Sequence, residues 1–78
     1  MKKGFSIIIS SNPVYDKLVA EIYYDSRLVA LLNQDDTSNG IKIEFPKHEG
    51  LDQAMICRCV PYDGFFVALE EAKWRLTE

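Results

Sequence analysis

Alternating apolar and polar residues predict a series of short β-strands before Pro61. The strictest alternation covers residues 41–45, where the pattern directs Ile41, Ile43 and Phe45 toward a core and the two intervening charged residues toward solvent. β-branched residues predict a strand over Phe5–Ser10, which the turn pair Asn12-Pro13 ends. Further strands are expected over residues 18–24, 28–33 and 54–60, with a tight hairpin turn at Asp25-Ser26.

Residues 64–76 have the periodicity of an amphipathic helix. At about 100° per residue, one stripe contains Phe65, Leu69, Ala72 and Leu76, with Ala68 and Phe66 on its two flanks. Asp63 is the expected N-cap of this helix. The predicted fold is therefore α+β: a four- to five-stranded antiparallel β-meander with one C-terminal helix packed across it.

Length and composition indicate one globular domain over residues 1–78. The chain is 47% hydrophobic and 27% charged, which is typical of a folded protein and not of a disordered one. The net charge of −3 is spread along the chain, without the basic cluster that nucleic-acid or anionic-membrane binding requires. We therefore expect neither a nucleic-acid partner nor a membrane partner.

The first residues also bear on the cellular location. Lys2 and Lys3 precede an apolar run at residues 5–9, but this run is shorter than the roughly 7–15 residues of a secretory signal. The two cysteines, Cys57 and Cys59, are separated by one residue, and in a strand this spacing suits a disulfide poorly. A reducing cytoplasm is the expected location.

Few residues suggest chemistry. Cys57, Cys59 and His48 are three candidate metal ligands or thiol-chemistry residues, but a closed zinc site needs four ligands, and small core side chains are the preferred interpretation of the cysteines. Asp35 and Asp36 belong to a polar loop tip over residues 35–40 and match no calcium-binding spacing. The four glycines are scattered and form no phosphate-binding loop. We expect no cofactor and no enzymatic activity.

The helix carries the most informative anomaly. Val67 and Trp74 are seven residues apart, so they share a helix face, and this face lies opposite the apolar stripe. If the stripe is buried, both side chains are exposed. Trp is enriched among the anchor residues of protein interfaces, although a small core also leaves some aromatic residues at its rim.

Three segments resemble short bacterial proteins of uncharacterised function, a set that includes candidate immunity partners of toxins. The segments are AEIYYDSRLVALLNQ at residues 20–34, IEFP at 43–46 and ALEEAKWRL at 68–76. They span about half of the chain and consist of residues that build a fold, so the resemblance transfers no binding or catalytic residue. It implies a bacterial origin.

The leading hypothesis is a small non-enzymatic protein-binding module, specifically an immunity-type inhibitor of a bacterial toxin. The expected partner-binding residues are Trp74, Val67, Glu70 and Glu71 on the outer helix face, with Asp35 and Asp36 as an alternative contact. One alternative is a structural homodimer that pairs through the helix face or an edge strand. A second alternative is a small enzyme or metal protein that uses Cys57, Cys59 and His48.

Overall fold

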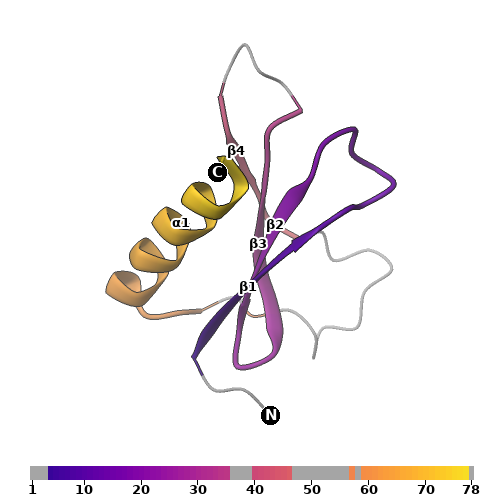
Figure 1. The fold of residues 1–78 in the computed structure, drawn as a ribbon. Coiled ribbons are helices and arrows are strands. Elements are labelled where there is room, and N and C mark those ends of the chain that lie inside the picture. The colour runs from indigo at the N-terminus through magenta and orange to yellow at the C-terminus, as the bar shows by residue number, and fades with distance from the viewer. Residues whose placement is uncertain (1–3, 36–39, 47–56, 58, 78) are drawn as a thin grey trace.

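The fold is an antiparallel sheet covered on one face by a single helix, in agreement with the predicted α+β class (Figure 1). The computed structural model describes residues 4–35, 40–46, 57 and 59–77. The strands lie in the order β1-β2-β3-β4, so each pairs with its neighbour in sequence as in a meander. The elements are β1 (Phe5–Ser10), β2 (Val19–Tyr24), β3 (Arg27–Asn33), β4 (Lys42–Glu44) and α1 (Tyr62–Thr77).

The predicted hairpin between the second and third strands is confirmed. Tyr24 of β2 is opposite Arg27 of β3, and Asp25 and Ser26 form the two-residue turn between them. Both turn residues have positive φ, 50° and 70°, which is the geometry of a type I′ turn. This turn matches the right-handed twist of the strands that it connects.

A β-bulge in β3 contributes to a second, smaller cluster of buried residues. The register between β2 and β3 shifts between Ile22 and Tyr23, so Val29 is an extra residue on β3. Val29 and its neighbour Ala30 consequently pack into the same cluster, together with Cys57. The Cys57 N–H also donates to the Leu28 carbonyl oxygen at 2.9 Å, alongside the part of β3 that β4 does not pair.

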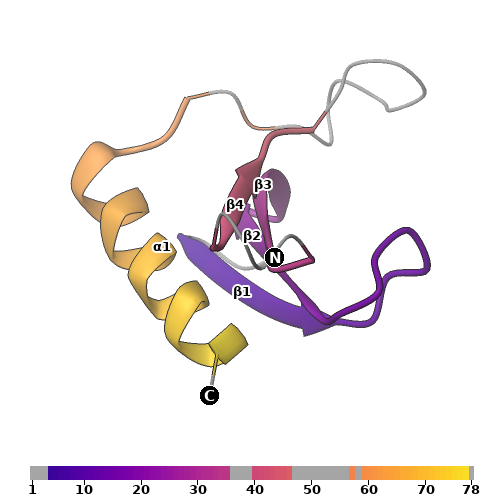
Figure 2. The same cartoon turned by 90° about the horizontal axis from the view of Figure 1, so that it is seen from above.

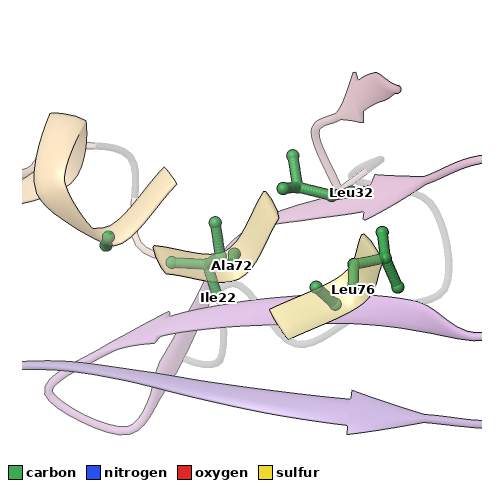
Figure 3. Packing of buried hydrophobic residues seen from close by; sticks show 6 residues of the cluster. Ile22, Leu32, Ala72 and Leu76 are labelled. Carbon is green, nitrogen blue, oxygen red and sulfur yellow. The ribbon is translucent and has the colours of Figure 1, made fainter. Parts of the chain in front are cut away.

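The main core lies between the sheet and the inner face of α1, which extends along β1 (Figure 2). Ile22 and Leu32 from the strands meet Ala72 and Leu76 from the helix (Figure 3). The buried helix residues are Ala68, Ala72 and Leu76, so two of the three are small. Ala68, predicted for one flank of the stripe, is buried, and Phe66, predicted for the other flank, is exposed.

The last strand is shorter than the alternation predicted. β4 contains three residues, and the expectation that Ile43 and Phe45 point into the core is wrong, because both are exposed. Ile41 does pack against the main core. The reason is the position of the helix: α1 lies over β1 and β2, so it does not cover the outer edge of the sheet beyond β3.

Two further boundaries differ from the predictions. The second strand begins at Val19, and Leu18, which was assigned to it, is an exposed loop residue. Most of the fifth strand predicted over residues 54–60 is outside the described residues, and Cys57, Cys59 and Val60 are not in regular strand. Within the described part of the chain the sheet therefore has four strands.

Asp63 is in the first turn of the helix and is not its N-cap. The Phe65 N–H donates to the Pro61 carbonyl oxygen at 3.0 Å, so the helical hydrogen bonds begin two residues earlier than predicted. Pro61 is the residue directly before α1, and its carbonyl oxygen accepts the first helical hydrogen bond. The Asp63 carboxylate still lies where the helix dipole favours negative charge.

Candidate functional site

The outer face of α1 presents two large apolar side chains to solvent. Val67 is 66% exposed and Trp74 is 62% exposed. Because the buried residues Ala68, Ala72 and Leu76 hold the opposite side of the helix against the sheet, Val67 and Trp74 cannot turn inward without undocking α1. The expected exposure of these two residues is confirmed.

Acidic residues accompany this apolar pair. Glu70 and Glu71 are both exposed and lie on the same outer half of the helix. Glu71 also forms an i,i+4 ion pair with Arg75 at 3.5 Å, which partly neutralises its charge. Four of the six predicted partner-binding residues are therefore gathered on one helix face. We name the surface formed by Val67, Glu70, Glu71 and Trp74 the outer helix surface.

The fifth predicted residue, Asp35, belongs to a different part of the molecule. Its carboxylate accepts hydrogen bonds from the backbone N–H groups of Asp16 and Lys17, both at 3.0 Å. The Asp35 side chain therefore connects the end of β3 to the loop between β1 and β2, while remaining exposed. Asp36, the sixth residue, is outside the described residues.

The same loop is attached to the sheet at a second point. The Tyr15 hydroxyl donates to Glu44 Oε2 on β4. This hydrogen bond, together with partial burial and the negative charges of Glu44 and Asp35, raises the pKa of Tyr15 to about 12. Asn12 shapes the turn that precedes it, since its carbonyl oxygen accepts from the Tyr15 N–H and its side-chain oxygen from the Val14 N–H, both at 2.9 Å.

A groove lies between this loop and the β3–β4 half of the sheet. It has a volume of about 620 Å³. Its walls are mostly apolar, with the Tyr15–Glu44 pair at one side. The lining residues are Val14, Tyr15, Leu28, Ala30, Leu31, Glu44, Phe45 and Pro46.

The cysteines occupy different environments. Cys57 is buried, as expected of a small core residue, and its thiol donates to the Cys59 carbonyl oxygen at 3.3 Å. Cys59 is exposed, so the expectation of a core position is wrong for this residue. His48 is outside the described residues. No group of three or more His, Cys, Asp or Glu side chains placed to hold a metal ion occurs in the described ranges.

The sequence did not reveal the contacts between the loop and the sheet. Tyr15, Glu44 and Asp35 come from three separate segments, and no spacing rule connects them. The one local signal was the Asn12-Pro13 turn, which indicates a reversal of the chain but not where the loop then packs.

Comparison with known proteins identifies no relative: no protein-family model, curated protein or solved structure matches this chain. Among the described residues, α1 is the one helix, and it is not long and apolar enough to cross a membrane.

Proposed function

We propose that this protein is a small, non-enzymatic protein-binding module that acts in the cytoplasm as an immunity-type inhibitor of a bacterial toxin. Its partner contacts the outer helix surface. The resemblance of three segments to short bacterial proteins motivates the immunity role, and the free thiols of Cys57 and Cys59 support a reducing compartment.

The observation that carries the proposal is the joint exposure of Val67 and Trp74 on a helix whose opposite face packs against the sheet. Trp residues dominate the energetics of many protein interfaces because a large flat side chain buries much area with little loss of conformational entropy. A single exposed aromatic residue is common on a small protein. An aromatic and an aliphatic side chain on one rigid helical face form a better anchor.

The negative charge of the outer helix surface supports a basic partner. Glu70 and Glu71 flank the apolar pair, and the whole chain has a net charge of −3. A basic partner, such as a toxin that acts on nucleic acid, would be attracted to this surface during association. The expected interface has an apolar centre at Trp74 and an acidic rim.

Capture of the partner from native cells tests the proposal, with the full-length tagged protein as bait. The wild type should retain a stoichiometric basic protein, and Trp74→Ala should weaken its binding by at least about tenfold, the effect of losing an interface hot spot. Leu18→Ala is the matched control, because Leu18 is 51% exposed in the loop before β2 and is not part of the outer helix surface. Its capture should equal that of the wild type.

The captured protein then decides between binding and inhibition. Its expression alone should arrest growth of a host cell, and co-expression of the wild-type module should restore growth, whereas Trp74→Ala should not. A partner retained equally by Trp74→Ala would contradict the assignment of the outer helix surface. A partner that is harmless on its own would contradict the immunity role.

A further inference from the structure

The outer edge of β1 carries unpaired backbone groups. β1 is the first strand of the sheet and pairs only with β2 among the described strands. At its start, the Asp25 N–H donates to the Gly4 carbonyl oxygen at 3.0 Å, so Gly4 faces β2. Because backbone direction alternates along a strand, the N–H and C=O groups of Phe5, Ile7 and Ile9 face away from β2.

This edge lacks the features that usually prevent strand pairing. Phe5–Ser10 contains no charged residue and no proline, and it extends over six residues. The opposite edge strand, β4, has three residues, of which Lys42 and Glu44 are charged. The two edges of the sheet therefore differ sharply in their protection against pairing with another chain.

One side chain of the described segments hydrogen-bonds the outer edge of β1. Arg75 Nη1 donates to the Ile7 carbonyl oxygen at 3.5 Å, from an exposed position on α1. This contact is long, and a carbonyl oxygen has two lone pairs, so a second donor can bond to the same oxygen. Among the outward-facing backbone groups of β1, the bond of Arg75 is to Ile7 and not to Phe5 or Ile9.

The sequence of β1 is self-complementary. The segment Ser6-Ile7-Ile8-Ile9-Ser10 reads the same in both directions. A two-fold axis brings residue i against residue j of the other copy and residue j against residue i, so a palindrome places like against like throughout. In an antiparallel arrangement centred on Ile8, serine faces serine and isoleucine faces isoleucine.

We propose that β1 pairs antiparallel with β1 of a second copy of this chain about a two-fold axis at Ile8. Ile7 of one copy then lies opposite Ile9 of the other, and these are the residues whose backbone groups face outward. Ile8, 49% exposed on the sheet face opposite α1, packs against Ile8 of the second copy. The two sheets become one continuous sheet with both helices on the same face.

Hydrogen exchange followed by NMR tests this pairing without any mutation. The amides of Ile7 and Ile9 point outward, so they should exchange rapidly at low protein concentration and slowly at high concentration. The amide of Ile8 points toward β2 and serves as the internal reference, with much smaller concentration dependence. If the exchange rates of the Ile7 and Ile9 amides do not change with protein concentration, the proposal is overturned.

A charge introduced at the two-fold axis provides an independent test. In analytical ultracentrifugation the wild type should approach twice 8.9 kDa as its concentration rises. Ile8→Lys should raise the dimer dissociation constant at least about tenfold, because two ammonium groups then lie directly opposite each other. A mixture of Ile8→Lys with Ile8→Glu should recover the dimer, which also shows that both variants are folded.

Two controls separate this interface from other associations. Leu18→Lys makes the same charge change at a similarly exposed loop position and should leave the dimer intact. Trp74→Ala should also leave the dimer intact, so loss of the toxin partner and loss of the dimer are distinguishable. A wild type that remains at 8.9 kDa at every concentration, or a dimer abolished by Trp74→Ala, refutes pairing through β1.

Discussion

The two faces of the sheet differ in how much apolar surface they bury and in how many polar contacts they make. On the face covered by α1, Ala20, Ile22 and Leu32 are buried in the main core, and Ile7 and Ile9 pack against it. On the opposite face, polar contacts attach the loop between β1 and β2 to the sheet. Val19, which is fully buried, lies on this opposite face too, so apolar burial contributes on both faces and exposed hydrogen bonds add to it on this one.

This difference determines where substitutions should be costly. Burial of a large apolar side chain contributes about 1.5–3 kcal/mol, and deletion of such a side chain also leaves a cavity. Hydrogen bonds at exposed positions contribute less, because water replaces the lost partner. The face under α1 should therefore dominate the free energy of unfolding, while the opposite face should determine local order.

Ile22→Ala should cause the largest effect. Ile22 is fully buried between β2 and α1, so we expect a loss of about 2–5 kcal/mol in the free energy of unfolding, measured by urea denaturation. Ile8→Ala on the opposite face of β1 is the matched control, and both variants are compared at a protein concentration low enough to keep the chain monomeric. Since Ile8 is half exposed, it should cost about 1 kcal/mol. Equal losses for the two variants would contradict the difference between the faces.

Asp35→Ala should have a smaller, local effect. It removes the acceptor of two backbone N–H groups at an exposed site, so the expected loss in unfolding free energy is about 1 kcal/mol. Faster hydrogen exchange should be confined to the amides of Asp16 and Lys17 and their neighbours. Asp16→Ala makes the same charge change but keeps the Asp35 carboxylate, so it should leave this exchange unchanged. Global acceleration in Asp35→Ala would contradict the local role.

The smallest effect concerns pH. The hydrogen bond to Glu44, with partial burial and the negative charges of Glu44 and Asp35, raises the Tyr15 pKa from 10.0 to about 12, so the protonated hydroxyl is favoured in the folded state. The contribution of Tyr15 to the free energy of unfolding is therefore fully present below pH 10 and is lost as the pH rises from 10 through 12. The absorbance change of tyrosinate, taken as the difference between wild type and Tyr15→Phe, measures this pKa.

Glu44→Gln provides the counterpart to the pH experiment. It removes the charged acceptor, which is the largest cause of the raised pKa, and the Tyr15 titration should move back toward pH 10. If the Tyr15 pKa is the same in Glu44→Gln and in the wild type, the loop is not held to β4 through this pair. The titration thus reports directly on the polar face of the sheet.

The structural position of a residue could be predicted from the sequence when it depends on neighbouring residues alone. Asp25 and Ser26 were assigned correctly to a tight turn because turn formation depends on neighbouring residues. Val67 and Trp74 were assigned to an exposed face because helical periodicity relates them to the buried stripe. Phe45 was assigned wrongly, because alternation indicates a face but cannot indicate whether anything covers that face.

The candidate surfaces show the same division. The palindrome in β1 and the composition of the outer helix surface are both properties of the sequence. That β1 lies at an edge, with Ile7 and Ile9 pointing away from β2, follows from the order of the strands. The role of Asp35 as an acceptor for a distant loop follows from contacts between segments that are remote in sequence.

By itself, the sequence determined the class of the fold, the main elements and the two-sided character of the helix, since these depend on residue preferences and periodicity over short distances. Only the tertiary structure decided that α1 covers β1 and β2 and leaves the end of β4 exposed, and that the loop after β1 packs against β3 and β4. The physical reason is that covering a face or closing a loop depends on the positions of several elements at once, and no local pattern specifies these positions.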